Sequence, residues 1–176
     1  MTDRKNLENK ESIKNNKLKI ILGVHQFFPE HQTGTEVLTL ELARGLRNLG
    51  HQVSIITGKI EQNISYSAKP WFSDYEYDGF TVYQLHYGVS NWHKIVFLEL
   101  YNHDRIGLIK ELLFTIKPNI VHFNHVIGFT PGIIRETRNM GIPVFFSATD
   151  FWPVCPAYTL YRRFENMVCE PPAKPH

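Results

Sequence analysis

The sequence predicts an α/β fold, a Rossmann-like three-layer domain with a mostly parallel sheet. Short apolar or β-branched runs alternate along the chain with segments of helical periodicity, which is the pattern of repeated βα units. The first run, 18–24, is almost wholly apolar, as expected of a strand covered on both faces. A length of 176 residues with 43% hydrophobic residues is enough for a full core without disulfides.

The opening unit is predicted to be strand, helix and strand. Strand 18–24 is followed by a helix that begins after Thr33, because Thr33 and Glu36 have the Thr-x-x-Glu spacing of a capping box. Gly50 is expected to end this helix, and strand 52–57 follows. These segments form a βαβ unit, whose crossover should be right-handed.

The middle of the chain is less regular. Residues 58–78 are polar and aromatic without a period, which predicts an excursion loop, and 79–85 alternates like a strand. A helical stretch over 92–116 is expected to break near 102–104 and to stop at Pro118.

The last predicted elements are strand 119–123, a helix and strand 143–147. Thr130 is expected to cap the helix with Pro131 at its first position, and Gly141 to end it.

The two ends of the chain carry no periodic pattern. Residues 1–17, rich in Asn, Lys and Glu, are predicted to be a disordered leader, and 18–176 to be the folded domain. Within that domain, residues 150–176 show no clear period.

Composition argues against several classes of protein. Nineteen Lys and Arg against 17 Asp and Glu give a net charge of +2, too small for the basic stripe of a nucleic-acid-binding protein. The charged N-terminus does not resemble a signal peptide, and no run of 18 apolar residues occurs, so a cytoplasmic protein is predicted. Cys155 and Cys169 are too few for a disulfide framework.

Polar residues gather just after the predicted strands. Ligands of open α/β sheets bind beyond the carboxyl ends of the strands, so these residues should converge on one crevice. His25 follows the first strand. The candidate site residues are Thr33, Gly34, Thr35, Glu36, His122, Asn124, His125, Thr149, Asp150 and Trp152.

Each candidate has a structural and a functional interpretation. Gly34 lies at a helix N-terminus, which suits a phosphate or a carboxylate but is equally explained as part of a cap. His125 lies past its strand, where an imidazole can orient or protonate a substrate oxygen, whereas His122 falls within the strand pattern and fits a core position as well. Asp150 can accept hydrogen bonds from hydroxyl groups or cap the turn before Pro153.

Other binding motifs are missing or ambiguous. The turn carries neither a dinucleotide fingerprint nor a P-loop, and the chain has no H-E-x-x-H or C-x-x-C spacing, so no metal site is predicted. Four aromatic residues of 58–78 either contact sugar rings or a membrane surface, or are buried for ordinary packing reasons. They are Trp71, Phe72, Tyr75 and Tyr77.

Several ordered motifs resemble the N-terminal half of a retaining glycosyltransferase of the GT-B fold, family 4. The loop and helix match at Pro29, Thr33, Gly34, Glu36, Leu42, Ala43, Leu46, Gly50, His51 and Val53. Further similar segments are 77–83, 117–122, 141–144, 150–152 and 155–156. Thr33, Asn124 and Thr149 depart from the family pattern, which leaves open whether His125 or His122 is the catalytic imidazole.

The resemblance implies transfer of a sugar, of the hexosyltransferase type, from a nucleotide-sugar to an acceptor with retention, without a metal or other cofactor. It implies that this domain holds the acceptor, a glycan or a lipid-linked acceptor in polysaccharide biosynthesis, and it allows peripheral contact at the inner face of the membrane. The turn at Gly34 would approach the donor diphosphate, and a strand-end histidine would contact the transferring sugar.

In such enzymes the donor binds mainly to a second domain carrying an E-x7-E element. No such glutamate spacing occurs in the 176 residues, so we expect a fragment that is inactive alone and needs the C-terminal domain of the same chain. The alternative is a stand-alone α/β module that binds or regulates without catalysis, since fold does not dictate function.

Overall fold

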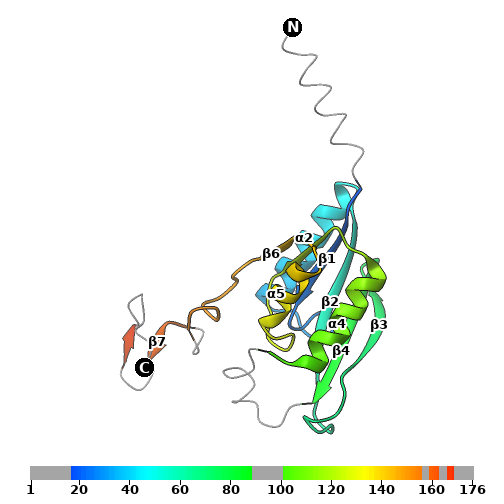
Figure 1. Ribbon diagram of the computed structural model, residues 1–176. Coiled ribbons are helices and arrows are strands. Elements are labelled where there is room, and N and C mark those ends of the chain that lie inside the picture. Colours follow the sequence, from blue (N-terminus) through cyan, green and yellow to red (C-terminus); the bar gives the residue numbers. More distant parts are fainter. Residues whose placement is uncertain (1–16, 89–100, 156–158, 163–165, 169–176) are drawn as a thin grey trace.

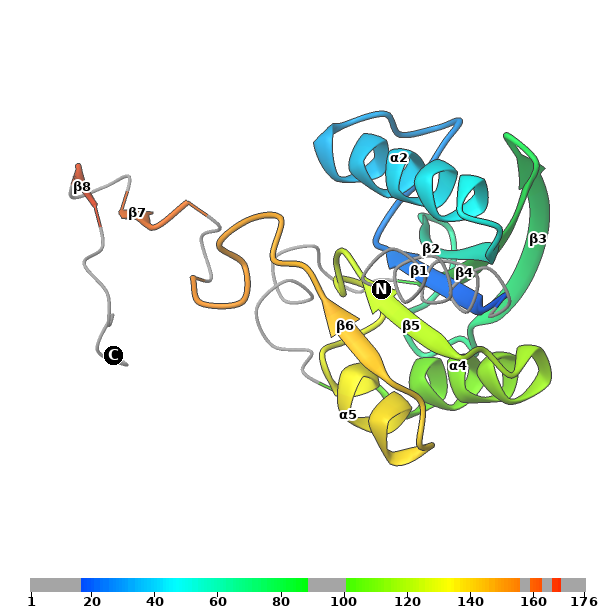
Figure 2. The same cartoon turned by 90° about the horizontal axis from the view of Figure 1, so that it is seen from above.

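The computed structural model contains a six-stranded sheet with helices on both faces (Figure 1). It describes residues 17–88, 101–155, 159–162 and 166–168. The strand order is β3-β4-β2-β1-β5-β6, and every neighbouring pair is parallel except β3 with β4. Viewed from above, α2 covers one face of the sheet, and α4 and α5 cover the other (Figure 2). The predicted three-layer α/β architecture is confirmed.

The opening unit is built as predicted, from β1 (Lys19–Val24), α2 (Gly34–Asn48) and β2 (Gln52–Glu61). The capping box forms at the start of α2, where the Thr33 amide donates to Glu36 Oε2 at 2.8 Å. Gly50 follows the helix with a φ of 92°, a conformation that favours glycine.

The predicted excursion loop over 58–78 is wrong in two places. β2 continues to Glu61, and β3 (Trp71–Tyr77) forms an antiparallel hairpin with β4 (Phe80–Gly88). The turn between them is Asp78-Gly79, with φ values of 52° and 73° as a tight hairpin turn requires. Because β3 is an edge strand whose faces are only partly buried, its sequence lacks clear hydrophobic alternation.

The break predicted near 102–104 is the start of α4 (His103–Ile116), whose N-cap is Asn102. The Asn102 side chain accepts the Arg105 amide at 3.0 Å. The helix ends at Lys117, which has a φ of 54° and precedes Pro118 as expected. Residues 92–100 of the predicted helix, like residues 1–16 of the predicted leader, lie outside the described residues.

The second half of the sheet consists of β5 (Ile120–Phe123), α5 (Gly132–Asn139) and β6 (Val144–Phe146). The predicted cap of α5 is wrong by one residue. Pro131 is the N-cap and no side chain caps the helix, because Thr130 has a φ of 67° and does not lead into the first turn. Gly141, with a φ of 78°, follows the helix as predicted.

A short antiparallel pair, β7 (Tyr161–Arg162) and β8 (Met167–Val168), was not expected from the sequence. It lies apart from the six-stranded sheet in both views (Figures 1 and 2). No helix in the part of the chain that the structure describes is long and apolar enough to cross a membrane.

The central strand β1 is buried on both faces and divides the core in two. Ile21 packs on the side of α4 and α5, whereas Ile20, Leu22 and Val24 pack on the side of α2. β1 lies between β2 and β5. The strands β2 to β4 are therefore added on one side of β1, and β5 and β6 on the other. Such a switch point places the ligand crevice of an open α/β sheet at the carboxyl ends of β1 and β5.

Candidate functional site

The carboxyl ends of β1 and β5 are joined by backbone hydrogen bonds. The amides of Asn124 and His125 both donate to the carbonyl oxygen of Gly23, at 2.8 and 3.4 Å. His25 directly follows β1, so this pairing brings His25 and His125 together. Their ring centroids are 4.5 Å apart.

His125 is held by partners on both ring nitrogens. Its Nδ1 accepts the amide of Ile127 at 3.1 Å, so in the neutral ring the proton resides on Nε2. Nε2 then donates to Oδ2 of Asp150 at 3.3 Å. Burial lowers the pKa of His125, and the Asp150 carboxylate partly opposes that shift. The result is an oriented, neutral imidazole at neutral pH.

His25 is a site residue to which the sequence analysis assigned no role. Burial, reinforced by the nearby His125, lowers the pKa of His25 to about 4. Glu36 opposes this shift, with its Oε1 3.8 Å from Nε2 of His25. Its position directly after a strand is the sequence signal that could have identified His25 as a site residue. The burial that lowers its pKa depends on neighbours that pack against it in the folded chain.

Glu36 is fully buried and has a structural function. Its Oε2 accepts both the amide and the hydroxyl of Thr33, which completes the cap of α2. Its Oε1 has no hydrogen-bond partner among the described residues and faces His25. Gly34 is exposed beside this cap, and a Cβ there would have no atom within 4 Å. The first turn of α2 is therefore open to a ligand, although Glu36 already neutralises part of its dipole.

Threonine and asparagine side chains connect three segments around the histidine cluster, which consists of His25, His125 and Asp150. Thr35 Oγ1 donates to Thr149 Oγ1 at 3.3 Å, and Thr149 donates to the carbonyl oxygen of Asn124 at 3.1 Å. The side-chain amide of Asn124 in turn donates to the hydroxyl of Thr39 in α2 at 2.9 Å. The start of α2, the end of β5 and the chain after β6 are thereby fixed to one another.

His122 and Trp152 occupy different places. His122 lies within β5, half-buried, and its Nε2 pairs with Ser147 Oγ at 2.8 Å. Burial lowers the pKa of His122. The Trp152 ring lies 5.5 Å from the His125 ring, and the Trp152 amide donates to Asp150 Oδ1 at 2.9 Å. Trp152 thus adjoins the cluster. His122 instead pairs with the segment of the same chain that follows β6.

The aromatic residues of β3 are mostly accounted for by packing. Tyr77 stacks on Phe28 with ring centroids 5.1 Å apart, and Tyr75 donates to the Phe28 carbonyl oxygen. Phe72 packs against the core on the side of α4. Trp71 is 39% exposed and stacks on His86. The structure thus favours the ordinary packing interpretation for three of the four.

The sheet edge therefore brings together most of the predicted candidates, from segments that are far apart in sequence. In the part of the chain that the structure describes, no three His, Cys, Asp or Glu side chains are arranged to hold a metal ion. That the reaction needs no metal remains a prediction.

Comparison with known proteins places this geometry in context. A protein from Klebsiella pneumoniae, described as "Uncharacterized 42.6 kDa protein in cps region", is 24% identical over 162 residues. The match covers 85% of this chain and 41% of the relative, so the chain spans about two fifths of that protein's length. A solved structure described as "Trehalose-6-phosphate from E. coli bound with UDP-2-fluoro glucose" matches with a TM-score of 0.44 and 8% identity, over 73% of this chain and 32% of the other.

The family itself is shown by a separate match. Residues 32–170 fit the sequence model of the family described as Glycosyltransferase Family 4. This range begins just before the capping box of α2 and includes β2 to β8. It spans most of the chain, and the protein therefore belongs to Glycosyltransferase Family 4.

Proposed function

We propose that this chain is the acceptor-side, N-terminal domain of a retaining GT-B glycosyltransferase, of the hexosyltransferase type, that takes its sugar from a nucleotide-sugar. The observation that carries the proposal is the convergence of α2's open first turn, the His25–His125 pair and Asp150 at one sheet edge, in a member of this family. The relative from a cps region is consistent with a role in polysaccharide biosynthesis.

His125 and Asp150 are proposed to bind the transferring sugar. Both ring nitrogens of His125 are already used, Nδ1 by the Ile127 amide and Nε2 by Asp150, so the imidazole contributes by holding the Asp150 carboxylate in place and by contact of its ring with the sugar. Asp150 is 38% exposed in its side chain, so its carboxylate can accept a sugar hydroxyl while still holding His125. Together they would position the anomeric carbon against the acceptor.

Gly34 and the first turn of α2 are proposed to approach the donor diphosphate. The first amides of a helix have no acceptor within the helix, and the absence of a side chain at Gly34 lets a phosphate come close to the backbone. No metal is needed in this scheme. The opposite wall of the cleft would be the C-terminal domain, which excludes water and completes the charge environment.

The experiment uses the full-length natural polypeptide with a panel of nucleotide-sugars. We expect release of nucleoside diphosphate from at least one of them, with transfer to acceptor and an unchanged anomeric configuration in the product by NMR. The chain alone should bind the same donor only in the millimolar range. If the full-length polypeptide consumes no donor and the chain alone binds one with micromolar affinity, the protein is instead a ligand-binding module.

A further inference from the structure

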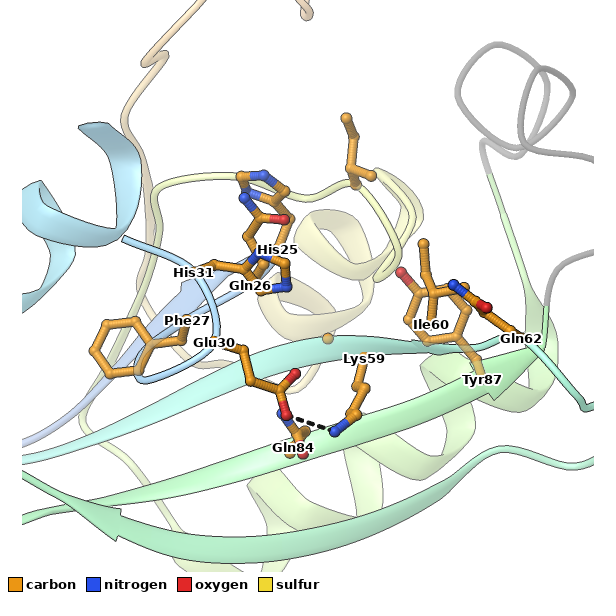
Figure 3. Close-up of a pocket in the computed structure, with 12 residues that line it drawn as sticks. His25, Gln26, Phe27, Glu30, His31, Lys59, Ile60, Gln62, Gln84 and Tyr87 are labelled. Atoms are coloured by element: carbon orange, nitrogen blue, oxygen red, sulfur yellow. Dashed lines mark hydrogen bonds and ion pairs between the residues drawn. The ribbon is translucent and has the colours of Figure 1, made fainter. Parts of the chain in front are cut away.

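A cavity of about 440 Å³ opens at the carboxyl edge of the sheet, beside the histidine cluster (Figure 3). It lies between the loop after β1, which carries His25 and Glu30, and strands β2 and β4, which carry Lys59 and Gln84. Its volume falls within the range of small-molecule sites, about 300 to 1,000 Å³. Because His25 contacts His125, the cavity adjoins the proposed sugar-transfer site.

The inner wall of the cavity is firmly built. Tyr87 is 3% exposed, and the Arg105 guanidinium lies 4.1 Å from the centre of its ring. Arg105 is itself buried and donates to the carbonyl oxygen of Gly128 at 3.1 Å. A Cβ at Gly128 would lie 2.2 Å from the Tyr87 hydroxyl, so the chain after β5 can approach this wall only through glycine.

The charges in the cavity cancel. Lys59 Nζ and Glu30 Oε1 form an ion pair at 2.7 Å, drawn as a dashed line in Figure 3. The pairing lowers the pKa of Glu30 and raises that of Lys59, so both remain ionised at neutral pH. An anionic ligand that approached Lys59 would therefore also meet the Glu30 carboxylate.

Besides the ion pair, the polar side chains that line the cavity are the amides of three glutamines, the imidazoles of two histidines and the hydroxyl of Tyr87. Gln84 lies on the same face as Lys59, since Thr57 is the register partner of Gln84 and Lys59 is two residues further along β2. Gln26 and Gln62 line the same cavity. An amide both donates and accepts hydrogen bonds, which matches the hydroxyl groups of a sugar and gives no preference for either charge.

We propose that this cavity binds the acceptor as an uncharged saccharide unit, and that the Glu30–Lys59 pair determines this selectivity against acidic sugars. The inference rests on the proposed function, because it names the chemical class of the acceptor. Apolar contacts come from Ile60 and Ile127, which can face the C–H groups of a pyranose ring.

The pair can be altered without unfolding the protein. The Glu30 and Lys59 side chains are 53% and 33% exposed, and ion pairs this exposed add little to folding stability. Glu30→Gln leaves Lys59 as an unpaired cation, and Lys59→Gln leaves Glu30 as an unpaired anion. The double variant is neutral again and serves as the matched control.

The test is a ligand-observed NMR titration of the full-length polypeptide with matched sugars. The probes are the methyl α-glycosides of glucose, galactose and mannose, and the corresponding methyl uronides, which differ by one carboxylate. The unaltered protein should bind at least one neutral glycoside more tightly than its uronide. Glu30→Gln should shift the affinity ratio towards the uronide by roughly twofold to fivefold, an effect that weakens at high salt.

Lys59→Gln should shift the ratio the other way, and the double variant should return it to that of the unaltered protein. The proposal is overturned if no neutral glycoside binds, if the uronides bind equally well, or if the ratio ignores both substitutions. Donor consumption is measured separately on the unaltered polypeptide. A failure of donor consumption alone counts against the proposed function, and a failure of the titration alone counts against the charge selectivity.

Discussion

The carboxyl edge of the sheet has a histidine side, around His25 and His125, and a cavity side, around Glu30 and Lys59. The charged residues of the two sides differ in burial and in their partners. On the histidine side, Glu36 is fully buried and His125 is 4% exposed, and their neighbours are other segments of the protein. On the cavity side, Glu30 is exposed and Lys59 is half-buried, and they pair with each other. Glu36 is thus part of a buried helix cap, whereas Glu30, less than ten residues away, is half of an ion pair at the surface.

The difference shows which physical effect sets each side's chemistry. On the histidine side burial is the main cause of the lowered pKa values of His25 and His125. On the cavity side the ion pair is the main cause of the shifts of Glu30 and Lys59. We therefore expect changes on the histidine side to affect turnover and the pH dependence of stability, and changes on the cavity side to affect ligand selectivity.

The largest expected effect is an acid sensitivity that originates at His25. The folded chain protonates His25 only near pH 4, whereas the unfolded chain does so near pH 6.5. Between these values the unfolded state binds more protons, so the free energy of unfolding falls as the pH drops from about 6.5 to about 4. The full contribution of this one group is about 3 kcal/mol, of which about 2 kcal/mol should be lost between pH 7 and pH 4.5, as measured by urea unfolding.

Two variants sharpen this prediction. His25→Asn removes the titrating group and should reduce the loss of stability between the two pH values, because asparagine binds no proton. Glu30→Gln, on the other side of the edge, should change stability at pH 7 by less than about 1 kcal/mol. An unchanged pH dependence in His25→Asn would show that burial of this histidine does not govern acid stability.

A smaller effect is expected where the two sides meet. A Cβ at Gly58 would lie 2.9 Å from the carbonyl oxygen of His25 and 3.2 Å from the Tyr87 ring. Gly58→Ala should therefore destabilise the fold by about 1–3 kcal/mol, measured by urea unfolding. Gly45→Ala is the matched control, because that position is exposed within α2 and has open space around it, and it should stabilise by about 0.5–1 kcal/mol. Equal effects of the two substitutions would contradict the close packing described at Gly58.

Sequence reasoning succeeded where local signals and burial agree. The apolar run of β1 and the capping box at Thr33 and Glu36 reflect interactions within a few residues, and both were predicted correctly. The edge strand β3 was missed because it is only partly buried, although Asp78-Gly79 is a hairpin turn signal. The convergence of polar residues followed from the rule for strand ends.

The pKa of His25 and the cavity beside it could not be predicted from local sequence patterns. The lowered pKa of His25 depends on burial beneath packed neighbours and on His125, a residue 100 positions away in the chain. The cavity beside it is formed by the loop after β1 and by two strands, one of which was predicted only to residue 57. Such properties belong to the assembled tertiary structure.

The most direct test of the account compares His125→Ala with His122→Ala in the full-length polypeptide. His125 lies in the cluster with Asp150, whereas His122, within β5, is paired with Ser147, which directly follows β6. We predict that His125→Ala lowers kcat by about 10²- to 10⁴-fold, with a change in Tm of only a few degrees. His122→Ala should lower kcat at least tenfold less. Equal losses of kcat, or a loss for His125→Ala that merely follows its Tm, would contradict the assignment of sugar transfer to this edge.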